Sequence, residues 1–141
     1  MRSLNYNIIC YAGTYATHTN RLLLLQKRAI RIINKSSFLA HTDPLFYSNK
    51  ILKLNDMYKL SVGLHMYANW ESGSFSSNHD YNTRNRNSLV PRAARLTVTQ
   101  NSLSVAGPNI WNSIPFEIRE SPTRNIFKNR MKNYLLSNYT L

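Results

Sequence analysis

The sequence predicts a mainly α-helical fold, and the spacing of its apolar residues is the main evidence. Three segments place apolar side chains at intervals of three and four residues, the spacing of one helix face. These segments are residues 21–35, 51–70 and 121–136. At 141 residues and 43% hydrophobic side chains, the chain is long enough for one compact core and short for two.

We therefore expect a small helical domain with three parts and no internal repeat. The first part, residues 1–70, contains a basic amphipathic helix and a buried central helix. The second, residues 71–104, is polar and contains arginines, and the third, residues 105–141, is helical again.

Residues 21–35, RLLLLQKRAIRIINK, give the clearest helical pattern. At about 100° per residue, one half of the helix is apolar and should be buried. Its members are Leu22, Leu25, Ala29, Ile30, Ile32 and Ile33. The opposite half contains the cations Lys27, Arg28, Arg31 and Lys35, with Leu24 among them. The hydroxyl or amide of Thr19 or Asn20 is suited to cap the first turn.

The next helices follow a connector. Pro44 favours a short helical turn with Asp43 as its cap. Residues 55–70 are apolar on almost every side, which is typical of a helix packed on both faces. Gly63 in this helix indicates a close approach by another helix.

Residues 71–104 are rich in Ser and Asn and predict a loop. Within this polar region, the alternation of RLTVTQNSLSV over residues 95–105 suggests a short β-hairpin.

The C-terminal part returns to helical signals. Pro108 is expected at the first position of a helical turn that Pro115 ends, with Trp111 as its core residue. Ser121 is expected to cap the last helix. The apolar side of that helix contains Phe127, Met131, Tyr134 and Leu135.

The charge balance points to a polyanionic partner. The chain has 18 Lys and Arg against 6 Asp and Glu, a formal net charge of +12. Nucleic acid is the first expectation and an anionic membrane surface the second. The alternative explanation of the composition is a coding sequence that is rich in adenine and thymine and drifts without selection, because such a sequence also encodes many Asn, Lys, Tyr and Ile residues.

Three groups of basic residues are candidates for phosphate contacts. They are Lys27, Arg28, Arg31 and Lys35; Arg84, Arg86, Arg92 and Arg95; and Lys128 and Lys132, with Arg130 between them. Tyr81 lies beside the second group and is a candidate for stacking on a base, or alternatively for folding onto the domain. The alternative for each basic group is an ordinary solvated surface.

The sequence gives no argument for catalysis. Its six acids lack the close pairing of metal-dependent polymerases and nucleases, and Glu117 and Glu120 are expected to be a solvated pair beside Arg119. The four histidines and the one cysteine, Cys10, lack metal-ligand spacing, and Cys10 is expected to be a small buried apolar residue. No nucleotide-binding fingerprint occurs. We expect no metal, no cofactor and no small-molecule substrate.

In the N-terminal segment SLNYNIICYAGTY, asparagines interrupt the apolar core that a signal peptide would need. No apolar run in the chain approaches the ~20 residues of a membrane-spanning helix. We therefore expect an intracellular chain, in nucleus or cytoplasm, that is neither secreted nor transmembrane.

Several phrases in order resemble one family. LLQKRAIRII, HTDPLF, ILKLND, HDYNTR, GPNIWNSIP followed by EIR, and NIFKNRMKNYLL extend across nearly the whole chain. Together they resemble the C-terminal region of non-LTR (LINE-type, jockey-like) retrotransposon polyproteins, downstream of the reverse transcriptase. The chain departs from that pattern at Tyr11-Ala12-Gly13, where the family often has a Trp-Gly-Gly-like turn.

The resemblance implies a parent protein that is an RNA-directed DNA polymerase, whose catalytic aspartates and endonuclease lie outside this chain. A start at Met1 within this region is expected of a truncated copy or of a trimmed gene model. The resemblance also implies a non-catalytic module that contacts template RNA or an RNA–DNA hybrid through phosphates, with the upstream polymerase domain as a second partner. The alternatives are a structural packing module, a decayed remnant without activity, and a peripheral binder of anionic membranes.

Overall fold

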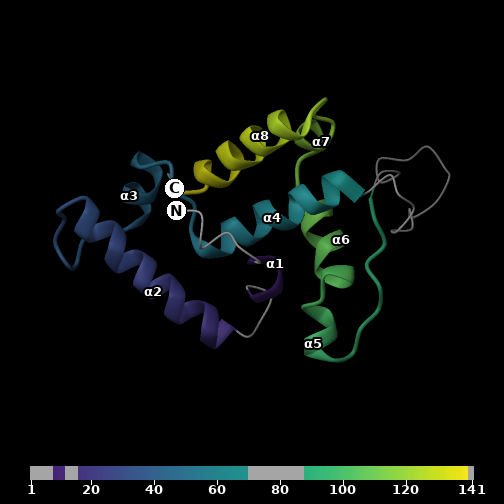
Figure 1. Cartoon of the computed structure of the whole chain (residues 1–141), viewed down its shortest axis with the longest axis horizontal. Helices are drawn as coiled ribbons and strands as arrows, with labels where there is room; N and C mark the ends of the chain where they lie inside the picture. Colours follow the sequence, from purple (N-terminus) through teal and green to yellow (C-terminus); the bar gives the residue numbers. More distant parts are fainter. Residues whose placement is uncertain (1–7, 12–15, 70–87, 140–141) are drawn as a thin grey trace. The chain divides into compact units, whose positions relative to one another are not determined.

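The computed structural model confirms a mainly α-helical chain and describes residues 8–11, 16–69 and 88–139 (Figure 1). The helices are α1 (Ile8–Tyr11), α2 (Ala16–Ile33), α3 (Asp43–Ser48), α4 (Leu54–Asn69), α5 (Thr97–Gln100), α6 (Leu103–Ser113), α7 (Phe116–Arg119) and α8 (Arg124–Ser137). The chain divides into two compact units. The first unit is Met1–Tyr58 with Asn129–Leu141, and the second is Lys59–Lys128.

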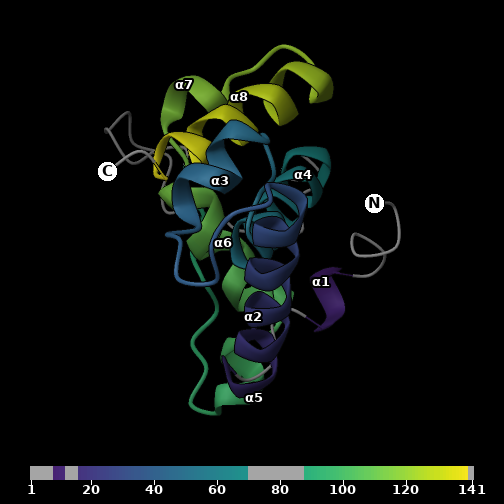
Figure 2. The same cartoon turned by 90° about the vertical axis from the view of Figure 1, so that its left-hand side faces the viewer.

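The core of the first unit is centred on Phe46 of α3, whose side chain is fully buried. Its other buried apolar side chains are Ile8, Ile30, Leu52, Leu54, Met131, Leu135, Leu136 and Tyr139. Helix α2 is fixed to the segment before α4 by the side chain of Gln26. The amide nitrogen of Gln26 donates to the Leu52 carbonyl (2.8 Å), and its oxygen accepts from the Leu54 amide (2.9 Å). Figure 2 shows α2 facing the viewer, with α3 beside its C-terminal end.

The prediction that half of α2 is buried was wrong. The inward side of α2 is a narrow stripe at intervals of four, three and four residues: Thr19, Leu23, Gln26 and Ile30. Among the apolar residues expected to be buried, only Ile30 is, at 2% exposure. Leu25 and Ile32 are 58% and 77% exposed. The two hydrogen bonds between Gln26 and the backbone turn this side of α2 inward. A prediction from hydrophobicity places glutamine on the exposed side of a helix, and it therefore chose the wrong face.

Helix α2 also begins earlier than expected. It starts at Ala16, so Thr19 and Asn20 lie inside the helix and neither is its N-cap. Cys10, expected to be buried, is exposed. Asp43 is the first residue of α3 and Thr42 occupies the cap position, so the short helix beginning at Asp43-Pro44 is confirmed but its cap is not.

Both α2 and α3 end in a Schellman motif with lysine in the left-handed conformation. Ser36 and Lys35 donate their amides to the Arg31 and Ile32 carbonyls, and Ile51 and Lys50 donate theirs to Phe46 and Tyr47. Lys35 and Lys50 have φ angles of 50° and 51°. Glycine is favoured at this position because a Cβ crowds the backbone there.

Replacing Lys50 by glycine should therefore stabilise the chain by about 0.5–1 kcal/mol. Relief of the left-handed strain exceeds the extra entropy that glycine gives the unfolded chain. Urea denaturation of wild type and Lys50→Gly measures the difference. Lys50→Ala keeps a Cβ at the strained position and should show no such gain; equal gains in both variants would contradict the strain argument.

Tyr139 joins the C-terminus of the chain to the start of α4. Its hydroxyl donates to Asp56 Oδ2 (2.5 Å) and accepts from the Lys53 amide (2.9 Å). The Lys53 ammonium lies 4.4 Å from the centre of its ring, and Phe46 contacts the ring edge-on at 6.4 Å. Burial, and then the hydrogen bond to Asp56, raises the pKa of the Tyr139 phenol well above its ordinary value of 10.0.

Tyr139→Phe should destabilise the chain by about 1–3 kcal/mol at pH 8, because Asp56 Oδ2 and the Lys53 amide each lose their hydrogen bond to the phenol. The raised pKa fixes the pH dependence. Below pH 10 the phenol is protonated in both states, and above it the unfolded chain releases the proton first. Wild-type stability should therefore fall above pH 10, and the difference between wild type and variant should shrink. Urea titrations at several pH values test this. Tyr134→Phe, at a 36% exposed tyrosine, is the control and should change little.

The second unit has a core of stacked aromatic rings around α8. Phe127 is fully buried, with its ring 4.7 Å from Tyr67 and 5.9 Å from Trp111. Trp111 is 3% exposed, which confirms it as a core residue. The close approach predicted at Gly63 is also confirmed. A Cβ there would lie 3.3 Å from the Ile114 side chain and 3.5 Å from that of Phe127.

The predicted hairpin over residues 95–105 was wrong, because this segment forms α5 and the start of α6. Its backbone is satisfied locally: Gln100 donates to Leu96, and Asn101 donates to Thr97. The Ser102 hydroxyl donates to the Thr99 carbonyl (2.5 Å) between the two helices. Serine and threonine side chains near helix ends form hydrogen bonds with nearby backbone groups in this way. These backbone groups therefore need no hydrogen bonds from a partner strand.

Two cap assignments in the last third also differ from the prediction. Pro108 lies inside α6 rather than at its first position, although the helix stops before Pro115 as expected. Ser121 does not cap α8. Its hydroxyl donates to Ile118 (2.7 Å) at the end of α7, and Thr123 Oγ1 accepts weakly from the Ile126 amide (3.4 Å) at the start of α8. Phe127, Met131 and Leu135 are buried as predicted, whereas Tyr134 is partly exposed.

Candidate nucleic-acid interface

The predicted cations of α2 lie together in the first unit, around a hollow at the end of the helix. Lys27, Arg28 and Arg31 are on the helix, and Lys35 follows its last turn. The hollow has a volume of about 420 Å³. We call it the basic hollow, and it is lined by Arg28, Arg31, Ile32, Lys35, Ser36 and Phe38. Three of the four predicted cations therefore line one depression, chiefly through the apolar parts of their side chains, and Lys27 lies outside it.

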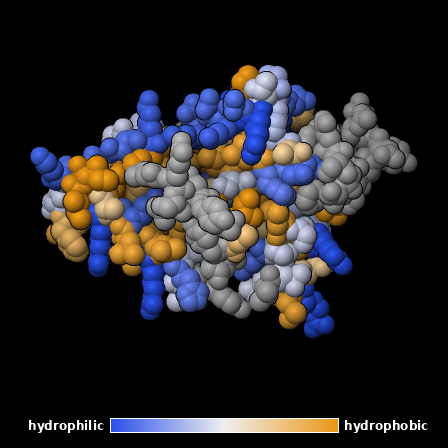
Figure 3. Space-filling model, in the orientation of Figure 1, coloured by the Kyte–Doolittle hydropathy of each residue, from blue (hydrophilic) through white to orange (hydrophobic). Residues whose placement is uncertain are grey.

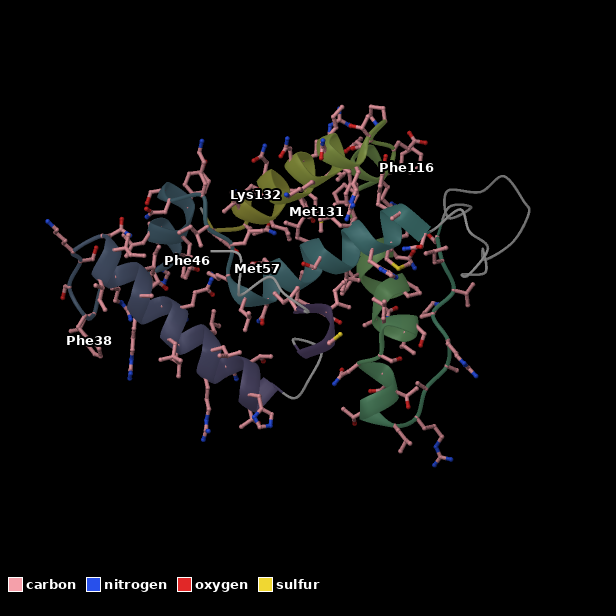
Figure 4. All side chains as sticks on the ribbon, in the orientation of Figure 1. Phe38, Phe46, Met57, Phe116, Met131 and Lys132 are labelled. Atoms are coloured by element: carbon pink, nitrogen blue, oxygen red, sulfur yellow. The ribbon has the colours of Figure 1, made fainter. Side chains whose placement is uncertain are left out.

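Phe38 is the aromatic residue of the basic hollow, and its side chain is 72% exposed. Figure 4 shows it projecting from the loop after α2, whereas Phe46 lies between α2 and α3. The Arg31 guanidinium lies 5.9 Å from the centre of the Phe38 ring. Arg31 Nε also donates to the Ala40 carbonyl (3.0 Å). Arg31 thus holds the loop and has fewer hydrogens left for a ligand than Arg28.

The conformation of Lys35 helps to form the hollow. Its left-handed backbone reverses the chain direction after α2, and the Ser36 amide closes the last turn on Arg31. Asn34 ties this turn to α3, because its side-chain oxygen accepts from the Asn49 amide (3.0 Å). The hollow is therefore framed by a hydrogen-bonded helix end.

Within the described part of the first unit, no acid pairs with Arg28, Arg31 or Lys35, whereas Lys27 is near enough to Asp43 to help Lys53 lower the pKa of that carboxyl. The only acids in this unit are Asp43 and Asp56. Asp43 pairs with Lys53 at 2.8 Å, and the hydrogen bond from Lys53 lowers the pKa of the Asp43 carboxyl. Asp56 accepts from Tyr139. Both carboxylates are engaged elsewhere, so the positive potential around Arg28 and Lys35 is left for an external anion.

Among the other predicted basic residues that the structure describes, none lines the basic hollow. Arg92 and Arg95 are exposed in the second unit, in the segment before α5. This segment is anchored by Asn112, whose side chain exchanges two hydrogen bonds with the Leu89 backbone (2.9 and 2.8 Å). Lys128 is exposed and Lys132 is half-buried on α8. Arg84, Arg86 and Tyr81 lie outside the described residues.

Sequence reasoning missed Phe38 and Ser36 as members of the site. The available signal was an aromatic residue in a short polar segment, directly after a basic helix. A loop aromatic that follows cations is the residue arrangement of a single-strand binding surface.

In the described ranges, no cluster of three or more His, Cys, Asp or Glu side chains is placed to hold a metal ion. None of the helices in these ranges combines the length and the apolar character needed to cross a bilayer. Comparison with known proteins finds no matching family profile, no matching curated protein and no matching solved structure.

Proposed function

We propose that the chain is a non-catalytic nucleic-acid-binding module that holds single-stranded RNA, or RNA of an RNA–DNA hybrid, at the basic hollow. The observation that carries this proposal is that Arg28, Arg31 and Lys35 line one hollow with the exposed Phe38 ring, and that none of the three pairs with an acid in the described part of the first unit. The cations contact backbone phosphates, with Lys27 adding charge outside the hollow. Arg92, Arg95, Lys128 and Lys132 are candidates for further contacts along a longer strand.

Phe38 favours an unpaired strand over a duplex. A base can stack on an exposed ring only when it is not already stacked within a double helix. The same ring beside phosphate-binding cations is suited to a looped or single-stranded RNA, whose bases can be turned outward.

The ordered motifs of the sequence support a more specific proposal, that the module is the C-terminal part of a non-LTR retrotransposon RNA-directed DNA polymerase. In that setting the ligand is the template RNA or its hybrid with the new DNA strand. The upstream polymerase domain is then the proposed protein partner.

A salt series with the full chain tests the function. We expect a labelled single-stranded RNA oligonucleotide to bind more tightly than duplex DNA of equal length, with the logarithm of affinity falling linearly with the logarithm of salt concentration. Fluorescence anisotropy between 50 and 300 mM salt, roughly, measures both. The proposal fails if neither RNA nor DNA is retained at the lowest salt concentration.

Phe38→Ala should weaken RNA binding by about 5- to 100-fold, because a stacked base contributes about 1–3 kcal/mol. The salt slope should stay unchanged, since no phosphate contact is lost. The matched control is Leu39→Ala, at the adjacent residue, which is 87% exposed and lies outside the hollow. An equal loss in both variants would argue against stacking on Phe38.

One observation favours a second function, that of a packing module for another protein. Helix α2 has an apolar surface that includes Leu22, Leu25 and Ile33, exposed residues that do not line the basic hollow. Figure 3 shows this hydrophobic surface over α2, crossed by projecting hydrophilic side chains.

A further inference from the structure

The exposed apolar residues of α2 follow the spacing of a coiled-coil seam. Leu22, Leu25, Ala29 and Ile32 are separated by three, four and three residues, the spacing of positions a, d, a and d in a heptad repeat. All four are exposed, and Leu25 and Ile32 are 58% and 77% exposed. We call these four residues the apolar seam. Exposed apolar surface of this extent marks a site of contact with another molecule.

The two borders of the apolar seam differ. On one side, Arg21 and Arg28 occupy successive g positions, and Lys35 follows the end of the helix. On the other side, the e positions are Gln26 and Ile33. Gln26 is directed toward the Leu52 and Leu54 backbone by two hydrogen bonds. The seam is therefore flanked by cations along one border only.

We propose that the apolar seam docks an amphipathic α-helix of a protein partner, with leucine or isoleucine at its own a and d positions and glutamate or aspartate beside them. The apolar side chains of the two helices interdigitate, and the partner's acids pair with Arg21 and Arg28. The 18 residues of α2 are sufficient for a short two-helix contact of this kind.

A second copy of the chain matches the seam poorly. Antiparallel pairing of two α2 helices would bring the arginine rows of the two copies opposite each other. Parallel pairing would bring Arg21 and Arg28 opposite Gln26 and Ile33, where no ion pair forms. The charge pattern thus favours an acidic partner over self-association.

A bilayer surface also matches less well. An interfacial helix presents a wide apolar face with cations along both edges. Here the apolar face is bordered on its second side by the buried stripe of Thr19, Leu23, Gln26 and Ile30. A narrow seam with a one-sided basic border has the geometry of a helix-to-helix contact.

The test uses the full chain and two synthetic helical peptides of about three heptads, both with leucine and isoleucine at a and d. One peptide has glutamate at e and g and the other has lysine there. We expect isothermal titration calorimetry to detect binding of the glutamate peptide, with affinity at least about tenfold above that of the lysine peptide. Leu25→Asp should remove the binding, since Leu25 lies in the middle of the seam.

A charge exchange makes the test specific. Arg21→Glu with Arg28→Glu should reverse the preference, so that the lysine peptide binds and the glutamate peptide does not. Lys27 lies on the opposite side of α2, so Lys27→Gln should leave peptide binding unchanged while reducing the salt dependence of RNA binding. Leu25→Asp should leave RNA binding largely unchanged, because Leu25 does not line the basic hollow. The failure of peptide docking is thereby distinguished from the failure of RNA binding.

Four outcomes would overturn the proposal. Equal affinity for the two peptides would show that apolar contacts alone cause the binding and that the arginines do not select an acidic partner. Concentration-dependent dimerisation that Leu25→Asp abolishes, without peptide binding, would assign the seam to a second copy. Flotation with vesicles of phosphatidylserine and phosphatidylcholine that Leu25→Asp abolishes, without peptide binding, would assign it to a membrane. Absence of binding to peptide, copy and vesicle would show that the seam docks none of them.

Discussion

Replacement of Phe127 by alanine is expected to destabilise the chain by about 3–5 kcal/mol, the largest effect of any single substitution considered. The ring is fully buried and stacks with Tyr67 at 4.7 Å and with Trp111 at 5.9 Å. Truncation loses the transfer free energy of the ring, opens a cavity and removes the aromatic contacts. The backbone of α4 at Gly63 has no side chain with which to fill the space.

Urea denaturation followed by far-UV circular dichroism measures this loss. The matched control is Lys128→Ala, because Lys128 is the next residue of α8 and is exposed. Its effect should stay within about 0.5 kcal/mol. A loss below about 1 kcal/mol in Phe127→Ala would show that the ring does not support the core of the second unit.

The sequence predicted the buried face of α8 better than that of α2. Phe127, Met131 and Leu135 repeat at intervals of four residues on a helix with few other apolar residues, so periodicity identifies one face. Trp111 and Gly63 were likewise identified, because a large aromatic side chain and a glycine inside a helix each have few structural uses. At these positions the local sequence is compatible with only one assignment of the buried side chains.

The buried face of α2 was predicted less well. The apolar residues of this helix outnumber the positions that one neighbouring surface can cover, so the pattern gives the amphipathic character but not the buried stripe. That stripe is decided by Gln26, whose partners are the backbone groups of Leu52 and Leu54, 26 and 28 residues away. Contacts of this range are not contained in a local pattern. Apolar residues of α2 that the core of the chain does not cover form the apolar seam.

The basic hollow was half predictable. The cations of α2 follow from helical spacing, which needs no tertiary information. Phe38 enters the site because Lys35 adopts a left-handed conformation and turns the chain back beside Arg31. Lysine at this position gives no sequence signal for such a turn, because glycine is the residue that usually marks it.

Neutralising all four cations of the α2 region, with glutamine at Lys27, Arg28, Arg31 and Lys35, is expected to reduce the salt slope of RNA binding by about 1.4–2. Each phosphate contact to a single strand contributes about 0.7 to that slope. Arg28 and Lys35 should supply most of the change, since Arg31 is engaged with Ala40 and Lys27 lies outside the hollow. At about 0.1 M salt this corresponds to a 10- to 100-fold weaker complex. A slope unchanged by all four substitutions would move the site to another basic group.

The two left-handed lysines separate charge from structure within this region. Lys35→Gly and Lys50→Gly relieve the same backbone strain at the same position of a Schellman motif, so both should stabilise the fold by about 0.5–1 kcal/mol. Only Lys35 lines the basic hollow. Lys35→Gly should therefore weaken RNA binding about fivefold at 0.1 M salt and reduce the slope by about 0.7, whereas Lys50→Gly should change neither. A more stable protein that binds RNA less tightly is a result that misfolding cannot produce, and equal RNA affinity of the two variants would remove Lys35 from the proposed site.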